Sequence, residues 1–117
     1  MFEFKEEHEY DWPVVVEMPV DGGKHEKREF TARFRVVPTD EAEEVLGGQG
    51  VAMLPDREQV EDFLRRVLVG WRDVSAEGSG DLPFSDENLA RMIRVPYVRR
   101  ALYEAYGQSI AGRREKN

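Results

Sequence analysis

The 117-residue sequence contains no cysteine, so no disulfide can form. It has only two histidines, His8 and His25, and no further nitrogen or sulfur ligand with which they would make a zinc site. No apolar run approaches the roughly 18 residues that a membrane-spanning helix needs. The acidic first ten residues lack the basic-then-apolar order of a signal peptide, so we expect a cytoplasmic protein that does not bind membranes.

The motifs of common enzyme classes are also missing. The sequence has no G-x-S-x-G, no P-loop and no G-x-G-x-x-G, and its GGQG segment is not followed by Lys-Ser/Thr. Residues 73–84 partly follow the pattern of a twelve-residue calcium-binding loop. However, the last position, which should supply a bidentate carboxylate, is Phe84. We therefore expect no metal site, no cofactor and no enzymatic activity.

The net charge of −7 is unevenly distributed. Residues 1–56 carry 14 acidic and 6 basic side chains, whereas residues 57–117 carry 10 acidic and 11 basic side chains. An acidic half repels phosphate, which disfavours direct binding of nucleic acid. Two interpretations remain open: a solvated surface that keeps the protein soluble, and an acidic face for a basic partner.

Two segments in the first third alternate apolar and polar residues, as half-buried β-strands do. The apolar positions are Trp12, Val14, Val16 and Met18 in the first segment, and Phe30, Ala32, Phe34 and Val36 in the second. The intervening VDGGK supplies glycines for a tight turn. We predict an antiparallel hairpin whose apolar face lies on helices or further strands, because a lone hairpin is only marginally stable. Phe2–Phe4 is a candidate for another short strand.

The rest of the sequence predicts helices. A short one begins at Thr39, which is placed to cap it, and a glycine-rich loop follows. Asp56 and Gln59 have the spacing of a capping box at the start of a helix over residues 57–70. The apolar stripe of that helix comprises Val60, Leu64, Val67, Leu68 and Trp71.

Two more helices follow the acidic loop after Trp71. Ser85 is placed to cap the first of them, and Phe84 and Leu89 occupy the positions of a hydrophobic staple. Pro96 suits the first position of a last helix, over residues 96–111. We expect Trp71 and Phe84 to anchor the two ends of the loop to the core, with Leu89 and Pro96 as further structural anchors.

The whole chain is predicted to be one domain of α+β class, in which a hairpin precedes three or four packed helices. Its parts are a β-hairpin region (1–38), a short helix with a flexible loop (39–56), a helical region (57–111) and a polar tail (112–117).

The last predicted helix carries the candidate partner-binding residues. Tyr97 and Tyr103 fall outside its apolar stripe, and Arg99 and Arg100 lie between them. Tyrosine is favoured at interfaces because it combines a wide apolar ring with a polar tip. The alternative is that both tyrosines cover the rim of the core or pack on the hairpin.

The stretch from Phe63 to Tyr106 resembles the tail assembly chaperones of long-tailed bacteriophages. The resemblance rests on a helix running into Gly-Trp, an acidic glycine-containing loop, a Leu-Pro-Phe-Ser segment, a short helix, a proline and a last helix ending in Ala-Tyr. In this sequence the corresponding positions are Gly70-Trp71, Asp73 to Asp81, Leu82-Pro83-Phe84-Ser85, Pro96 and Ala105-Tyr106.

The resemblance implies a non-enzymatic protein that binds the long helical tape-measure protein and keeps it soluble in the host cytoplasm. Such a protein leaves when tail-tube subunits polymerise, so it is not expected in the mature virion. The tail-tube protein and a second copy of the chain are further expected partners. Two alternative functions remain: a small structural neck or tail-completion protein of the virion, and an acidic inhibitor that mimics nucleic acid.

The resemblance also implies a longer product made by ribosomal frameshifting, as occurs in many such families. The final residues Glu115, Lys116 and Asn117 can be encoded by a slippery run of adenines. Sequencing these codons tests the hypothesis, because codons that interrupt the run would exclude this slippery site.

Overall fold

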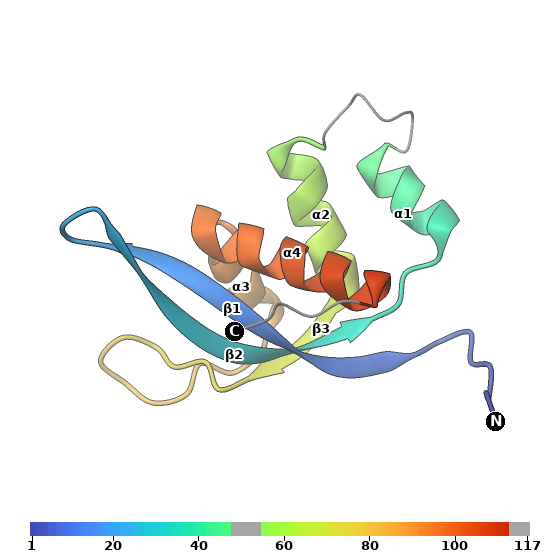
Figure 1. The fold of residues 1–117 in the computed structure, drawn as a ribbon, viewed down its shortest axis with the longest axis horizontal. Coiled ribbons are helices and arrows are strands. Elements are labelled where there is room, and N and C mark those ends of the chain that lie inside the picture. The colour runs from blue at the N-terminus through green and yellow to red at the C-terminus, as the bar shows by residue number, and fades with distance from the viewer. Residues whose placement is uncertain (48–54, 113–117) are drawn as a thin grey trace.

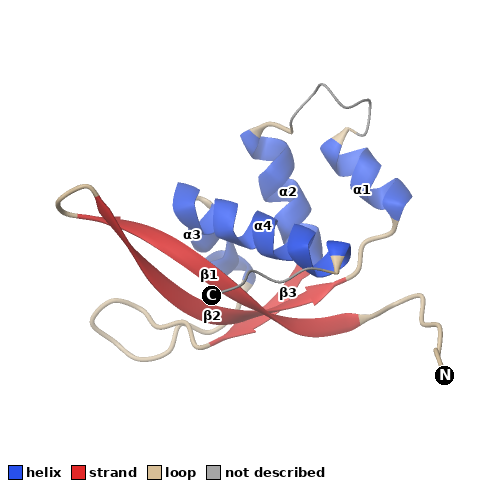
Figure 2. Ribbon diagram, viewed as in Figure 1, coloured by secondary structure: helices blue, strands red, loops and turns tan. Residues whose placement is uncertain are grey.

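The computed structural model describes residues 1–47 and 55–112 of the chain. Within these ranges lie three strands and four helices, namely β1 (Glu9–Val20), β2 (Lys24–Arg35), α1 (Thr39–Leu46), α2 (Arg57–Val67), β3 (Leu68–Arg72), α3 (Asp86–Ile93) and α4 (Pro96–Ala111). The strands form an antiparallel sheet in the order β1-β2-β3, and the helices gather on one face of it (Figure 1 and Figure 2). The predicted α+β class is confirmed.

The β1–β2 hairpin has the predicted alternation of apolar and polar positions. Trp12 lies opposite Ala32, and Val14 lies opposite Phe30. These four side chains share the face that the helices cover, and all of them except Trp12 are buried. Burying a side chain of the size of valine or phenylalanine contributes roughly 1.5–3 kcal/mol, so this face supplies much of the core.

The two ends of the hairpin differ from the body of the strands. At the turn, Gly22 and Gly23 have φ angles of 86° and 75°, which glycine adopts without steric cost. At the other end β2 stops at Arg35, so the alternation breaks and Val37, rather than the predicted Val36, is buried. Beyond the start of β1, Phe2 and Phe4 are 83% and 71% exposed, and the strand predicted there is wrong. Residues 2–4 pair with no strand of the β1-β2-β3 sheet, and their two aromatic rings stay in solvent.

The predicted helix over residues 57–70 is wrong at its C-terminal end. The helix ends at Val67, and the next five residues form strand β3. β3 adds to the edge of β2 that β1 leaves free, placing Trp71 opposite Ala32. The predicted helical region therefore contains a strand.

Hydrophobic periodicity does not distinguish a helix from a strand at residues 68–72. Leu68 and Trp71 continue the apolar stripe of α2 in helical spacing, although both belong to the strand. Val69 and Gly70 are the local signals that favour a strand over a helix, since one is β-branched and the other lowers helix propensity. The open edge of β2 decides the outcome because it offers hydrogen-bond partners to an extended segment.

Most of the predicted helix starts are confirmed. The Asp56 carboxylate accepts a hydrogen bond from the Gln59 backbone at 2.8 Å, and the Gln59 side chain accepts one from the Asp56 backbone at 2.8 Å, which completes the capping box. Ser85 Oγ accepts from the Asn88 backbone N–H at 3.0 Å. Pro96 is the first residue of α4, which ends at Ala111 as predicted.

The predicted cap of α1 is wrong. Pro38 precedes the helix in an extended conformation, and Thr39 is already its first helical residue. The Thr39 hydroxyl is therefore one position too late to cap the helix, and no side chain bonds to the exposed N–H groups from the N-cap position. Residues 48–54 of the predicted glycine-rich loop (47–56) and residues 113–117 of the predicted tail (112–117) lie outside the described residues.

The core lies between the sheet and the helices. It is centred on Phe34, which is fully buried with ring centroids of Tyr106 and Tyr10 at 5.4 and 6.1 Å. Tyr106 also accepts a hydrogen bond from the Val37 backbone at 3.2 Å, which fixes α4 to the segment after β2. The other fully buried large side chains are Leu64, Leu68, Ile93, Leu102, Val14 and Val67.

Candidate partner-binding groove

A groove opens where the β1–β2 hairpin extends past the helices. In Figure 1 the hairpin tip projects beyond the beginning of α4, on the side of the molecule away from the N-terminus. The groove has a volume of about 380 Å³. Its lining comprises Val16, Met18, Arg28, Glu29, Phe30, Asp73, Val74, Ser75, Met92, Tyr97 and Val98. We call this set of residues the hairpin groove.

The floor and walls of the hairpin groove are mostly apolar. Val16 and Phe30 at its base are buried, whereas Met18, Met92 and Val98 are only partly covered. Methionine is flexible and polarisable, so it adapts to apolar side chains of different shapes. The groove therefore offers an adaptable apolar surface between a strand pair and the junction of two helices.

One wall of the hairpin groove is the loop that follows β3. The chain leaves the sheet at Asp73, whose φ of 66° is the only positive value of a non-glycine residue in the described ranges. Ser75 and Asp81 then pair as an isolated β-bridge, and the Leu82 backbone N–H donates to the Val74 carbonyl at 2.8 Å. Because of these contacts the loop folds back on itself like a hairpin, and Val74 stays next to the groove.

The predicted anchors hold the two ends of this loop together. The rings of Trp71 and Phe84 meet edge to face with centroids 4.9 Å apart. The Trp71 indole N–H donates to the Leu82 carbonyl at 2.8 Å. Leu89 on α3 is buried, and Pro96 begins α4 at the corner that follows α3. The loop therefore connects β3 to α3 with its two ends held together by direct contacts. No group of three or more potential metal ligands occurs among the described residues.

Of the four predicted partner-binding residues, one lines the hairpin groove. Tyr97 is half-buried and stands between this groove and a second, more polar hollow. Arg100 is exposed and lines only that second hollow, together with Val15 and Glu17 of β1. The second hollow is smaller, at about 240 Å³, and charged side chains contribute much of its lining.

The other two predicted residues serve the packing of the helices. Arg99 donates to the Ile93 carbonyl at 3.1 Å and lies 3.6 Å from the carboxylate of buried Glu61. It joins α2 to the α3–α4 corner, and its side chain is only 17% exposed. The Tyr103 ring packs edge to face on Phe63 at 5.9 Å, and burial raises the pKa of its hydroxyl. Tyr103 thus covers the rim of the core.

Of the eleven residues that line the groove, the sequence analysis identified only Tyr97 as a member of a site. Met18 is part of the predicted apolar face of β1, and Met92 belongs to the apolar side of α3. Val74 lies in the acidic loop, where nothing marks it as a contact. An unusually long apolar face on the hairpin is the one available signal, since Met18 lies beyond the region that the helices bury.

The sheet face opposite the helices carries ion pairs. Asp11 accepts from Arg72 at 2.6 Å and from Arg33 at 3.0 Å, and Arg33 also contacts Glu9 at 3.3 Å. The guanidinium of Arg72, followed by that of Arg33, lowers the pKa of the Asp11 carboxyl. Because these carboxylates are paired with arginines across three strands, this face is not the open row of acids that a nucleic-acid mimic requires.

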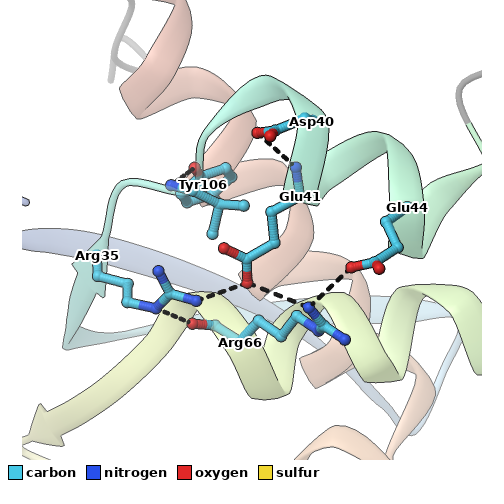
Figure 3. A network of polar contacts seen from close by, with 7 residues as sticks. Arg35, Asp40, Glu41, Glu44, Arg66 and Tyr106 are labelled. Carbon is cyan, nitrogen blue, oxygen red and sulfur yellow. Dashed lines mark hydrogen bonds and ion pairs between the residues drawn. The ribbon is translucent and has the colours of Figure 1, made fainter. Parts of the chain in front are cut away.

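A second network joins α1 to the remainder of the fold. The Glu41 carboxylate accepts from Arg35 of β2 at 2.8 Å and from Arg66 of α2 at 3.3 Å, and Arg66 also lies 3.5 Å from Glu44 (Figure 3). Arg35 first, and Arg66 second, lower the pKa of Glu41. Arg35 also donates to the Arg66 carbonyl at 2.7 Å. These groups bond to one another and leave no free cluster of charge for a ligand.

The family comparison agrees with the resemblance seen in the sequence. A family model described as phage tail assembly chaperone matches residues 2–117. The chain belongs to the phage tail assembly chaperone family. Comparisons with curated proteins and with solved structures gave no match.

Family membership extends the resemblance from the Phe63–Tyr106 segment to nearly the whole chain, including the hairpin. A tail assembly chaperone acts on other tail proteins and needs binding surfaces rather than reacting groups. None of the helices in the described parts of this chaperone is long and apolar enough to cross a membrane. The hairpin groove is a candidate for a protein-binding surface.

Proposed function

We propose that this chaperone binds the phage tape-measure protein and keeps it soluble until the tail tube forms around it. The observation that carries the proposal is the hairpin groove, an apolar surface on the inner face of the hairpin that the helices cover only in part. A long amphipathic helix exposed before assembly would aggregate through its apolar stripe. Transient cover by a small acidic protein prevents this, and the net charge of −7 keeps the complex soluble.

The groove suits reversible binding. Its partly covered residues, among them Met18 and Met92, come from elements that the buried core already holds in place. The partner therefore meets a pre-formed surface and the chain pays little ordering entropy on binding. A small interface of this kind gives modest affinity per copy, which allows the tail-tube protein to displace the chaperone during polymerisation.

Co-expression with the tape-measure protein of the same phage tests the proposal. We expect the tape-measure protein to remain in the soluble fraction and to co-purify with the wild-type chain. The double variant Met18→Gln and Met92→Gln should lose co-purification, because it places amides in the groove while the fully buried core is unchanged. Ile110→Gln is the matched control, since Ile110 is an exposed apolar residue of α4 outside the groove.

The location of the chaperone in the infection cycle supplies the second readout. We expect the chain in infected host cells and its absence from purified virions. Recovery from virions at a fixed stoichiometry would instead support a neck or tail-completion protein. Tape-measure protein that stays equally soluble with the double groove variant would show that the groove is not the binding surface.

A further inference from the structure

Residues 1–7 form an arm that extends from the fold before β1 begins. His8 attaches the arm to the sheet, because its carbonyl accepts a hydrogen bond from the Val36 backbone at 3.0 Å. Every residue of the arm is exposed. Phe2, Phe4 and Val36 help to line a hollow of about 490 Å³, so the two rings are not packed closely on the fold. We call residues 1–7 the aromatic arm.

The aromatic arm carries most of the strongly exposed apolar surface. In the ranges that the structure describes, the strongly exposed large apolar side chains are Met1, Phe2, Phe4 and Ile110. The rings of Phe2 and Phe4 have centroids 6.4 Å apart, so they form one pair. A single exposed apolar side chain is common, whereas neighbouring ones that form a patch are typical of a surface that another molecule covers.

The hairpin groove has side chains that suit these rings. Its partly covered residues include Met18 of β1, Met92 of α3 and Tyr97 of α4. A thioether contacts an aromatic ring favourably, and methionine adapts its shape to the ring that it meets. Phe2 and Phe4 are two residues apart, so both can point to the same side of an extended segment. A short extended arm can therefore place two rings in the groove together.

The aromatic arm does not reach the groove of its own chain. The N-terminus and the hairpin tip lie at opposite ends of the molecule (Figure 1). Met18 follows Glu9, the first residue of β1, by nine residues, which is about 30 Å at 3.3 Å per residue. Phe2 and Phe4 precede Glu9 by seven and five residues, so a fully extended arm moves them at most about 25 and 18 Å. The groove that these rings can fill belongs to another molecule.

We propose that Phe2 and Phe4 of one copy insert into the hairpin groove of a second copy, and that this contact closes the groove until the tape-measure protein displaces the arm. The displacement rests on the proposed function, whereas the contact between copies does not. The arm and the groove are different surfaces, so two joined copies keep one free arm and one free groove. The association can therefore continue to longer chains of copies.

The size of the contact makes this association weak. An aromatic side chain buries roughly 150–250 Å², so the two rings contribute about 300–500 Å². With a similar area from the groove, the total is about 600–1,000 Å², below the roughly 1,200 Å² at which stable interfaces begin. We therefore expect monomers in dilute solution and joined copies in concentrated solution. A partner that buries more surface in the groove displaces the arm.

Sedimentation velocity between 10 and 500 µM is the first test. We expect the average size of the wild-type chain to rise with concentration. The arm variant Phe2→Ser with Phe4→Ser and the groove variant Met18→Gln with Met92→Gln should each weaken self-association at least about 10-fold. Ile110→Gln is the control, because Ile110 is exposed but lies outside the arm and the groove. A wild-type chain that stays monomeric at 500 µM would overturn the proposal.

A mixture of the two variants is the sharper test. The arm variant keeps an intact groove, and the groove variant keeps an intact arm. Each should be monomeric alone, and an equal mixture should form a complex of one copy of each that grows no further. Circular dichroism and the melting temperature check that both variants are folded. A folded mixture that stays monomeric would overturn the proposal, and so would a groove variant that self-associates like the wild type.

Salt distinguishes an apolar contact from a charged one. Each copy carries a net charge of −7, so the copies repel one another at low ionic strength. Raising NaCl from 50 to 500 mM screens this repulsion and should strengthen self-association. Self-association that weakens over this range would mean that ion pairs join the copies, which contradicts the proposal.

The tape-measure protein separates this inference from the proposed function. Its addition should break the joined copies of the wild-type chain into smaller complexes, and the arm variant should still keep it soluble. If the arm variant captures the tape-measure protein but self-associates like the wild type, the arm inference is wrong and the proposed function stands. If the groove variant captures the tape-measure protein normally but does not self-associate, the groove binds a second copy and the proposed function is wrong.

Discussion

Trp71 offers the sharpest test of how the loop after β3 is held. Its indole N–H donates to the Leu82 carbonyl at 2.8 Å, and its ring lies edge to face on Phe84 at 4.9 Å. Trp71→Phe keeps an aromatic ring but removes the donor. Trp71→Ala removes both contacts.

The structure gives the magnitudes. The hydrogen bond contributes about 1 kcal/mol, so Trp71→Phe should lower the free energy of unfolding by about 1–2 kcal/mol once the smaller ring is included. The indole is only half-buried, so exposing its covered surface costs roughly 2–3 kcal/mol. Adding the hydrogen bond, we expect Trp71→Ala to lower the free energy of unfolding by about 3–4 kcal/mol.

The assay is urea denaturation followed by far-ultraviolet circular dichroism, with the slope compared between variants to confirm two-state behaviour. A double-mutant cycle with Phe84→Ala isolates the ring contact, for which we expect a coupling of about 0.5–1.5 kcal/mol. Trp12→Phe is the matched control: Trp12 is also half-buried on the inner face, but none of the hydrogen bonds found among the described residues involves its indole N–H.

Two results would refute this reasoning. The first is a Trp71→Phe variant as stable as the Trp12→Phe control, which would mean that the indole hydrogen bond contributes nothing. The second is strictly additive behaviour of Trp71→Ala and Phe84→Ala, which would mean that the rings do not anchor the loop as a pair.

Three further predictions concern the helices. Ser85→Ala should cost about 1 kcal/mol by removing the N-cap of α3, measured by urea denaturation, with Ser85→Asp retaining most of the stability. Glu61→Gln should cost about 1–2 kcal/mol because it leaves Arg99 without a compensating charge, and additivity with Arg99→Met would contradict this. Burial raises the pKa of Tyr103 above its usual 10.0, so the neutral hydroxyl favours the folded state. That contribution is complete below pH 10 and is lost as pH rises through the folded pKa, and Tyr103→Phe should therefore reduce the alkaline loss of stability.

Local signals in the sequence predicted the parts of the fold that depend on neighbouring residues. The hairpin follows from alternation around Gly22 and Gly23, and the starts of α2, α3 and α4 follow from Asp56, Ser85 and Pro96. Each of these features is a contact within a few residues of chain. The strand β3 depends instead on the free edge of β2, whose paired residues lie 34 to 41 positions away in sequence, and no local pattern contains this information.

The candidate site was harder to predict for the same reason. Tyr97 was identified because a single helix shows which of its residues leave the apolar stripe. The contact between Arg99 and Glu61 could not be predicted, because Glu61 lies on another helix. The groove joins residues from β1, β2, the loop, α3 and α4, so it exists only once the sheet and helices are packed together.

The β1–β2 hairpin is longer than the part of its inner face that the protein buries. The buried part of the inner face ends at Val16 and Phe30, yet both strands continue to Val20 and Lys24. A chain selected only for stability would gain little from Met18, which the helices cover only in part. Its apolar side chain gains its full burial when another molecule covers it. The hydrophobic free energy that the isolated chain does not gain at Met18 is therefore available for binding.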